Sequence, residues 1–255
     1  MTAFPEARTA VLTGVGSPRG IGRRTAHLLA ERGWNLGLMA RTDEQAQDLA
    51  QEISASYGVQ ALGAGADVTV SSEVAEVARL FEAELPQIVG LANFAGVSSA
   101  VPYLEITDEE WTRVLTNNLT ATHIVTQTFG RIMADAGVGR IVGLSSVTAQ
   151  RGGGTFSKTA YAASKAGIIG LIRGVARELG PFGVCANSIS PGPVDTDIMG
   201  GTLDDGRRNA MAADTVLGRI STTDDVAAAT AFLLSEEAGH ITGQTLSING
   251  GLHFH

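Results

Sequence analysis

Short apolar segments alternate with amphipathic segments along the whole chain of 255 residues. The apolar segments predict buried strands near 9–13, 35–40, 60–66, 88–93, 140–145, 184–189 and 245–248. The segments between them have helical periodicity, near 20–32, 43–56, 71–85, 108–136, 159–180 and 223–235. Because strands and helices alternate, we predict an α/β fold in which helices cover both faces of a doubly wound parallel sheet of about seven strands.

The organisation of the chain predicts a single domain over residues 1–255, because no linker, repeat or low-complexity segment interrupts the alternation. The segment 195–220 differs from the rest, since it is rich in glycine and aspartate and has only weak periodicity. Loops of this length are commonly lids or disordered segments. We therefore predict a substrate lid near 195–220.

Three of the predicted helices begin with sequences that favour helix N-termini. Thr42 and Gln45 have the spacing of a capping box, and so do Thr107 and Glu110. Thr223 precedes two acidic residues, which favour the positive end of the helix dipole. These signals place the starts of the helices near 43, 108 and 223.

Composition and charge exclude several classes of function. A net charge of −8 and the lack of a Lys/Arg-rich run argue against a nucleic-acid-binding protein. No run of about 18 apolar residues occurs, which argues against a membrane span. The five histidines form no ligand set, so we predict no catalytic metal. The single cysteine, Cys185, cannot form an internal disulfide, and no signal-peptide pattern precedes the first strand, so we predict a cytoplasmic protein.

A glycine-rich turn joins the first predicted strand to the first predicted helix, with the sequence Thr-Gly-Val-Gly-Ser-Pro-Arg-Gly-Ile-Gly over residues 13–22. Glycines allow the backbone to approach a pyrophosphate, and the helix N-terminus supplies free N–H groups and a positive dipole. The alternative is a tight turn that needs glycine only for its positive φ. The candidate cofactor-binding residues of this turn are Gly14, Ser17, Arg19, Gly20, Ile21 and Gly22.

A second signal is the pair Tyr161 and Lys165, which lies about 140 residues after the turn. Residues four apart on a helix share one face, so the phenol and the ammonium can meet at one site. A nearby positive charge lowers a tyrosine pKa from its usual value of about 10. This spacing also occurs by chance in surface helices, but together with the turn it makes Tyr161 a candidate general acid and base.

The ordered set of motifs resembles the short-chain dehydrogenase/reductase family over essentially the whole chain. The motifs are the glycine-rich turn, Asp67-Val68, Asn93-Phe-Ala-Gly96, Asn118, Ser145-Ser146, the Tyr161/Lys165 pair and Pro191-Gly192. Two features depart from the family pattern. Five residues separate Gly14 from Gly20, more than is usual in the family, and Phe94 replaces an amide residue. The resemblance implies a Rossmann-type fold and an enzyme that interconverts a ketone and a secondary alcohol.

The end of the second strand bears on the choice of cofactor. An acidic residue there binds the ribose of NAD, and a basic one accommodates the 2′-phosphate of NADP. Ala40 stands where NAD-preferring relatives carry Asp, and Arg41 follows it. Asp43 is counter-evidence, although it also suits the first turn of the next helix, and Arg41 could be merely a solvated charge. We predict NADP(H) rather than NAD(H), with Arg41 and Arg19 facing the phosphate.

The resemblance implies further contacts to the cofactor. Asp67 would hydrogen-bond the adenine, although a role in its own turn is the alternative. The segment after the sixth strand would pack on the nicotinamide. The implied cofactor residues outside the glycine turn are Arg41, Asp67, Val68, Asn93, Ala95, Gly96, Tyr161, Lys165, Pro191, Gly192, Val194 and Thr196.

The family pattern also implies a catalytic set. Tyr161 would exchange a proton with the substrate oxygen, and Lys165 would hold down its pKa and bind the nicotinamide ribose. Ser146 would hydrogen-bond the substrate oxygen, and because successive strand residues point to opposite faces, Ser145 cannot share that role. Asn118 would link Lys165 to solvent through water, unless it is only a polar residue that faces solvent from a helix.

The substrate and the assembly are less constrained. A 3-oxoacyl thioester and a sugar or polyol both suit the resemblance, and the polar loop 150–158 leans slightly towards a small polar substrate. A non-catalytic nucleotide-sensing or scaffold protein on the same fold is the alternative. The helix 159–180 carries more apolar residues than one buried stripe needs, with small residues at Ala166, Gly170 and Gly174. This helix and the C-terminal run 244–255 predict a homotetramer with two self-complementary contacts.

Overall fold

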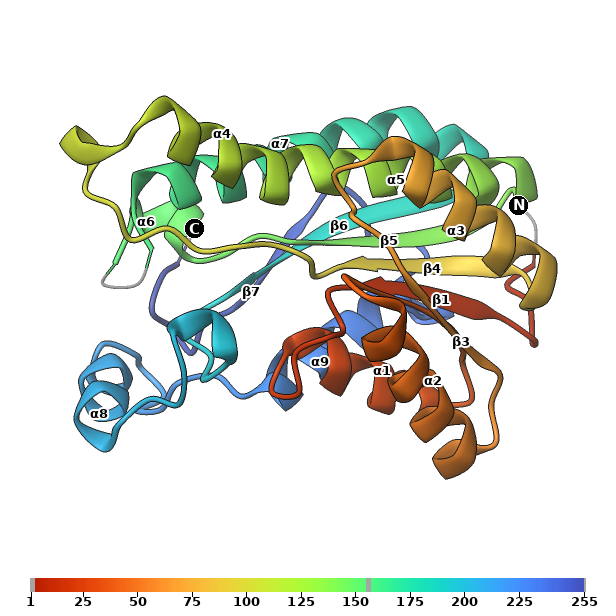
Figure 1. Ribbon diagram of the computed structural model, residues 1–255, viewed down its shortest axis with the longest axis horizontal. Helices are drawn as coiled ribbons and strands as arrows, with labels where there is room; N and C mark the ends of the chain where they lie inside the picture. The colour runs from red at the N-terminus through yellow and green to blue at the C-terminus, as the bar shows by residue number, and fades with distance from the viewer. Residues whose placement is uncertain (1–2, 155–156, 255) are drawn as a thin grey trace.

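Seven parallel strands form one sheet in the computed structural model, which describes residues 3–154 and 157–254 (Figure 1). The strands are β1 (Thr9–Thr13), β2 (Asn35–Ala40), β3 (Ala61–Gly65), β4 (Ile88–Asn93), β5 (Gly139–Leu144), β6 (Val184–Pro191) and β7 (Thr245–Ile248). Their order across the sheet is β3-β2-β1-β4-β5-β6-β7, and each neighbouring pair is parallel. The predicted doubly wound sheet is confirmed, because the order reverses between β1 and β4.

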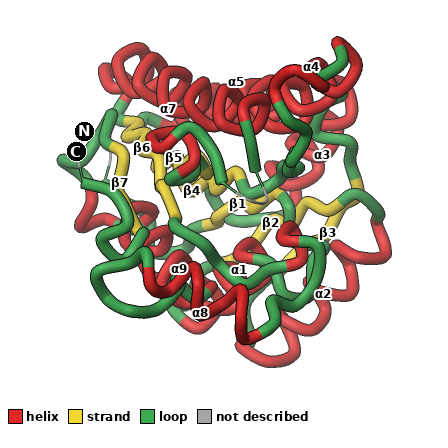
Figure 2. Tube along the Cα trace, turned by 90° about the vertical axis from the view of Figure 1, so that its left-hand side faces the viewer, coloured by secondary structure: helices red, strands yellow, loops and turns green. Residues whose placement is uncertain are grey.

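Helices cover both faces of the sheet, as predicted. They are α1 (Ile21–Glu31), α2 (Asp43–Tyr57), α3 (Ser71–Glu84), α4 (Asp108–Leu115), α5 (Ala121–Ala136), α6 (Thr148–Arg151), α7 (Thr159–Leu179), α8 (Asp205–Ala213) and α9 (Thr223–Leu234). Helices α1, α2 and α9 lie on one face, and α3, α4, α5 and α7 lie on the other (Figure 1). Figure 2 shows the sheet enclosed between these two helical layers. Each face has its own hydrophobic cluster, which is why the strands are apolar throughout instead of alternating.

The predicted helix 108–136 is interrupted. Helix α4 ends at Leu115, a π-helical turn spans Thr116–Thr120, and α5 begins at Ala121. The side chain of Asn118, within this turn, accepts a hydrogen bond from the Val97 backbone N–H and donates one to the Val97 carbonyl. A π-turn adds a residue to the helical path. It thereby directs Asn118 towards the segment after β4.

Helix starts agree with the predicted capping signals at two of the three places. The hydroxyls of Thr42 and Thr107 each accept a hydrogen bond from the backbone N–H three residues on. Helix α9 is capped by Thr222, one residue before the predicted signal at Thr223. Thr222 and Asp225 form a complete capping box, in which each side chain binds the other residue's backbone N–H.

The segment 195–220 contains α8, which its weak periodicity did not predict. None of the described residues of α8 is buried, so no apolar stripe marks it in the sequence. The Asp204 side chain caps its first turn by accepting from the Arg207 N–H at 2.9 Å. Helix α8 projects from the body of the molecule beside the C-terminal ends of the strands (Figure 1).

Candidate active site

A cavity of about 930 Å³ opens at the carboxyl ends of the strands. Residues that follow different strands line it, including Gly14 after β1, Arg41 after β2, Ala95 after β4, Ser146 after β5 and Gly192 after β6. It therefore includes the point between β1 and β4 where the strand order reverses. Open α/β sheets bind their ligands at this place, because the loops on either side diverge there.

Most of the predicted site residues line this cavity. They are Gly14, Ser17, Gly20, Ile21, Gly22, Arg41, Asp67, Val68, Ala95, Gly96, Ser146, Tyr161, Pro191, Gly192, Val194 and Thr196. Four predicted residues are not among its lining residues, namely Arg19, Asn93, Asn118 and Lys165.

The glycine turn brings three backbone segments into close contact. Gly14 has a φ of +69°, and a Cβ on it would lie 2.6 Å from the backbone nitrogen of Ala95. A Cβ on Gly22 would lie 2.8 Å from the Gly14 carbonyl oxygen. Helix α1 starts just after Gly20 with no side chain capping its first turn, so its N–H groups are free for an anion. This cradle fits a pyrophosphate despite the unusual length of the turn.

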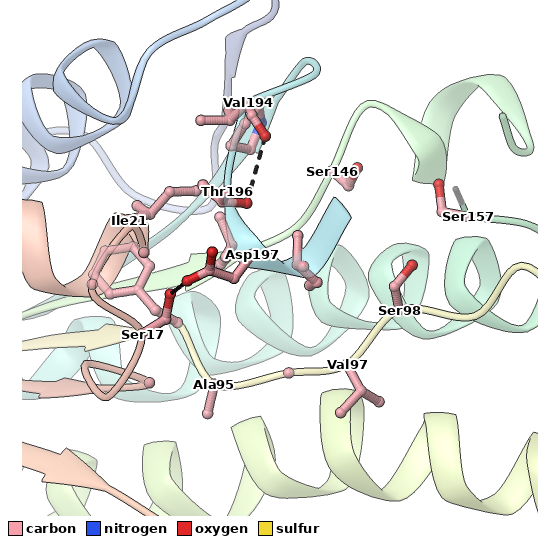
Figure 3. A pocket seen from close by; sticks show the side chains of 18 of the residues that line it. Ser17, Ile21, Ala95, Val97, Ser98, Ser146, Ser157, Val194, Thr196 and Asp197 are labelled. Carbon is pink, nitrogen blue, oxygen red and sulfur yellow. Dashed lines mark hydrogen bonds between the residues drawn. The ribbon is translucent and has the colours of Figure 1, made fainter. Parts of the chain in front are cut away.

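Arg19 is not among the residues that line the cavity. Its guanidinium forms ion pairs with Asp195 and Asp197 and donates a hydrogen bond to the Thr202 hydroxyl at 2.8 Å. The structure therefore does not bring Arg19 to the predicted phosphate contact, because carboxylates from the 195–220 segment bind it instead. Ser17 does line the cavity, where its hydroxyl donates to the Asp197 carboxylate (Figure 3).

Just after β2, Arg41 is exposed and lines the cavity. Asp43 lies in the first turn of α2, and its carboxylate accepts a hydrogen bond from the Gly65 N–H at 2.7 Å. Asp43 is thus engaged with the backbone. The Asp67 carboxylate accepts from both the hydroxyl and the N–H of Thr69, and these hydrogen bonds hold its pKa below the usual value. Asp67 therefore supports its own turn while it also lines the cavity.

The Asn93 side chain is directed into the protein, away from the cavity. It is buried, and its amide donates to the Thr126 hydroxyl of α5 at 3.0 Å. The backbone that follows is held close to β1, because the Thr13 hydroxyl accepts from the N–H groups of Phe94 and Ala95. Phe94 is part of the hydrophobic core and also lines the cavity. A cofactor contact by Asn93 is therefore not supported through its side chain.

The two adjacent serines follow directly after β5, and their hydroxyls have different partners. The Ser145 hydroxyl is buried and donates to the Lys165 carbonyl of α7 at 2.8 Å. Ser146 lines the cavity and is hydrogen-bonded to Tyr161. The structure thus brings together the predicted proton donor and the predicted oxygen-binding hydroxyl.

Lys165 lies behind Tyr161, where its side chain is 2% exposed. Its ammonium donates to the Leu144 carbonyl at 2.8 Å and lies 5.6 Å from the centroid of the Tyr161 ring. Burial lowers the pKa of Lys165 to about 8. Burial raises the pKa of Tyr161 to about 12, although its hydrogen bond to Ser146 acts in the opposite direction.

These pKa values correct the expectation that the Lys165 ammonium depresses the pKa of the Tyr161 phenol. The ammonium donates to the Leu144 carbonyl, and the loss of solvent around the phenol raises the Tyr161 pKa, with the hydrogen bond to Ser146 as the opposing effect. In this structure Tyr161 is therefore protonated at neutral pH.

Asn118 is fully buried beside Lys165. Besides its two bonds to Val97, its amide donates to the Ser164 hydroxyl of α7 at 2.9 Å. A Cβ on Gly96 would lie 2.7 Å from the Asn118 amide oxygen and 3.6 Å from the Lys165 nitrogen. Because Gly96 has no side chain, Asn118 and Lys165 can approach the cavity lining at this position, and Asn118 does not face solvent.

Several residues of the cavity were not predicted individually. They include Gln45, Ser98, Thr148, Arg151, Ser157, Asp197, Asp214 and Leu252. Figure 3 shows Ser98, Ser146 and Ser157 at one end of the cavity, with Ser17 and Asp197 at the other. The loop 150–158 and the segment 195–220 had been singled out as wholes, whereas Leu252 lies after β7 and carries no local signal. Residues 155 and 156 of that loop and His255 lie outside the described part of the chain.

Within residues 3–154 and 157–254, no group of three or more His, Cys, Asp and Glu side chains is arranged to hold a metal ion. No helix in the same ranges is long and apolar enough to cross a membrane.

Comparison with known sequences places this geometry among oxidoreductases. A family model described as enoyl-(acyl carrier protein) reductase matches residues 14–253. A 3-oxoacyl-[acyl-carrier-protein] reductase of Escherichia coli is 35% identical over 97% of this chain and 98% of that protein. A short-chain reductase protein of Streptomyces niveus is 36% identical over 98% of this chain and 95% of that protein.

Comparison with solved structures agrees. A crystal structure described as a candidate NAD(P)-dependent gluconate 5-dehydrogenase from Beutenbergia cavernae, with NADP bound at low occupancy, matches with a TM-score of 0.86. The two chains are 36% identical, and the match covers 96% of each. Fold and sequence similarity thus extend over the same region.

Proposed function

Because the chain belongs to the short-chain dehydrogenase/reductase family of NAD(P)-dependent oxidoreductases, we propose that it interconverts a ketone and a secondary alcohol with NADP(H). The observation that carries the proposal is the hydrogen-bonded pair Ser146 and Tyr161 on the wall of a cavity that also contains the glycine turn. A proton donor and a hydroxyl that can bind a carbonyl oxygen lie together where a nicotinamide would reach them.

The residues present fit a dinucleotide along the length of the cavity. The turn at Gly14 and Gly22 and the N-terminus of α1 would bind the pyrophosphate. Asp67 and Val68 would face the adenine, and Arg41 would face the 2′-phosphate of NADP. The segment from Pro191 to Thr196 would pack on the nicotinamide. When bound, the cofactor supplies or accepts the hydride.

The protein's own part in the reaction is to control a proton and a developing charge. In reduction, Tyr161 donates its proton to the substrate oxygen, and Ser146 donates a hydrogen bond to the same oxygen. In oxidation, Tyr161 must first lose its proton. Since burial raises the pKa of Tyr161 to about 12, oxidation is favoured by high pH and reduction proceeds at neutral pH.

Lys165 and Asn118 support this pair from behind Gly96. The Lys165 ammonium carries three N–H donors, of which the Leu144 carbonyl takes one, so the others are available for the nicotinamide ribose. Asn118 would connect Lys165 to solvent through water, and its bonds to Val97 hold the wall of the cavity in place.

Two substrate classes remain open. A relative described as a 3-oxoacyl-[acyl-carrier-protein] reductase favours a 3-oxoacyl thioester, and a structural neighbour described as a gluconate dehydrogenase favours a sugar acid or polyol. Hydroxyls at Ser98 and Ser157, at the same end of the cavity as Ser146, favour a small polar substrate. A non-catalytic nucleotide sensor is the alternative, and the presence of both Tyr161 and Lys165 speaks against it.

We further propose a homotetramer in which α7 packs on its symmetry mate. Ile168 and Ile172 are buried against the sheet, whereas Ala166 and Gly170 are exposed on the outer face. No atom within the described part of the chain lies within 4 Å of a Cβ built on Gly170 or Gly174, so a second helix can approach closely.

The test of the catalytic proposal is Tyr161→Phe, which removes the acidic hydroxyl and keeps the ring. NADPH oxidation by the wild type is first measured against a panel of 3-oxoacyl thioesters, keto sugar acids and simple ketones. We expect the variant to lose at least about 100-fold in kcat on the best substrate, the lower end of general acid–base contributions, with NADPH affinity nearly unchanged. Turnover near the wild-type level in this variant would refute the role of Tyr161.

A further inference from the structure

Thr148 connects the proposed catalytic serine to the substrate loop. It is the first residue of α6, and its side chain is 7% exposed. Its hydroxyl oxygen accepts a hydrogen bond from the Ser146 hydroxyl at 3.1 Å, and its backbone N–H donates to Ser146 Oγ at 3.2 Å. The same Thr148 hydroxyl lies 3.1 Å from the Ser157 hydroxyl. Tyr161, Ser146, Thr148 and Ser157 therefore form one continuous chain of hydroxyl groups.

We propose that Thr148 is a positioning residue that directs the Ser146 hydroxyl at the substrate oxygen, and that the hydroxyl chain reverses its direction when the substrate binds. This inference rests on the proposed function, since it assigns Ser146 to a carbonyl or alcohol oxygen. It adds a residue outside the predicted set of Ser146, Tyr161, Lys165 and Asn118.

The reversal follows from the number of donors. A serine hydroxyl has a single O–H, and in this structure the Ser146 hydroxyl donates it to Thr148. To bind a substrate oxygen, Ser146 must withdraw that donor. The Thr148 hydroxyl can then rotate and donate to Ser146 Oγ, because Ser157 can donate to Thr148 in turn. Each O–H only rotates, so no covalent bond breaks and no proton is transferred.

The reversed chain also strengthens the catalytic hydrogen bond. Hydrogen bonds in series polarise one another, so a Ser146 that accepts from Thr148 becomes a better donor to the developing oxyanion. Because Thr148 is buried, water does not readily replace it in the chain. The Thr148 backbone N–H also donates to Ser146 Oγ and holds it in place. A backbone N–H can only donate, so it cannot accept the Ser146 O–H in one state and donate in the other, as the Thr148 hydroxyl can.

Two substitutions separate the hydroxyl from the shape of the side chain. Thr148→Val keeps the volume and removes the hydroxyl, and Thr148→Ser keeps the hydroxyl. Thr230→Val is a matched control, because Thr230 is also buried but donates to the Val226 carbonyl within α9 and is not among the residues that line the cavity. Thermal melting and NADPH titration verify that each variant folds and binds the cofactor.

We measure kcat for reduction of the best ketone from the substrate panel. We expect Thr148→Val to lose about tenfold in kcat, which corresponds to about 1.4 kcal/mol, while its KM for NADPH stays unchanged. Thr148→Ser and Thr230→Val should stay within about twofold of the wild type, since neither removes a hydroxyl from the chain.

The pH profile of alcohol oxidation is a second readout, which a purely structural role would not move. In Thr148→Val the Ser146 O–H loses its Thr148 acceptor and is free to donate to the Tyr161 oxygen, which lowers the pKa of Tyr161, so the rising limb of the profile should shift to lower pH. A Thr148→Val enzyme with wild-type kcat and pH profile overturns this inference alone. A wild type that reduces no carbonyl compound of the panel overturns the proposed function and this inference with it.

Discussion

The buried ammonium of Lys165 should make the cofactor-free protein less stable at neutral pH than a variant without it. Lys165→Met replaces the ammonium with an apolar side chain of similar length. The charged form costs free energy because the side chain is 2% exposed and its surroundings solvate the charge poorly. Burial accordingly lowers the pKa of Lys165 from 10.5 to about 8.

The size of the effect follows from this pKa difference. At 1.36 kcal/mol for each pKa unit, the buried charge costs about 3 kcal/mol of stability at pH 7. Loss of the charged hydrogen bond to the Leu144 carbonyl offsets about 1.5 kcal/mol of this gain, so Lys165→Met should be about 1.5 kcal/mol more stable than the wild type at pH 7.

The stability difference also depends on pH. Between the folded pKa of about 8 and the unfolded value of 10.5, the unfolded wild type binds more protons than the folded protein. Wild-type stability therefore rises with pH in this window relative to the variant. The difference in free energy of unfolding between Lys165→Met and the wild type should be largest below pH 8. At about pH 9.5 this difference should be about 2 kcal/mol smaller.

Urea unfolding of the cofactor-free wild type and variant, monitored by tryptophan fluorescence at pH 7 and at about pH 9.5, measures the difference in their free energies of unfolding. Lys158→Met is the matched control, since Lys158 is the only other lysine of the chain and lies at the start of α7 without being fully buried. Lys165→Met should also lose most of its catalytic activity, so this substitution raises stability and lowers function. If Lys165→Met is less stable than the wild type at pH 7, or if the difference does not change with pH, the reasoning from burial is wrong.

Three further predictions test the cofactor, the lid and the assembly. Arg41→Met should weaken NADPH binding by about 1.5–3 kcal/mol, as for a charged hydrogen bond, and leave NADH binding nearly unchanged in calorimetric titrations; a wild type that prefers NADH would contradict the assignment. The segment 197–214 should gain protection from hydrogen exchange when cofactor and substrate bind, because Ile198, Met211 and Asp214 already line the cavity and closure would exclude water; equal exchange with and without ligands would argue against a lid. Light scattering at micromolar concentration should give a mass of four times the chain mass of 26.3 kDa, and a single species at the chain mass would exclude the tetramer.

The sequence by itself determined the order and type of the main elements, and the reason is that their signals are local. Alternating apolar and amphipathic segments predicted all seven strands within about two residues. The glycine turn and the Tyr161/Lys165 pair were recognisable because positive φ at Gly14 and helical spacing act over a few residues. Helix α8 was not predicted, because none of its described side chains is buried. The π-turn at Asn118 was not predicted either, because it depends on the hydrogen bonds between Asn118 and Val97.

Only the tertiary structure decided where individual side chains point. Arg19 looked like a phosphate ligand in the sequence, but Asp195, 176 residues further along the chain, comes close enough to bind it. Thr148 carried no signal, because its role arises when the loop after β5 meets the loop before α7 at Ser157. The high pKa of Tyr161 is likewise a property of packing, since burial of the phenol raises it and the hydrogen bond to Ser146 only partly opposes that effect.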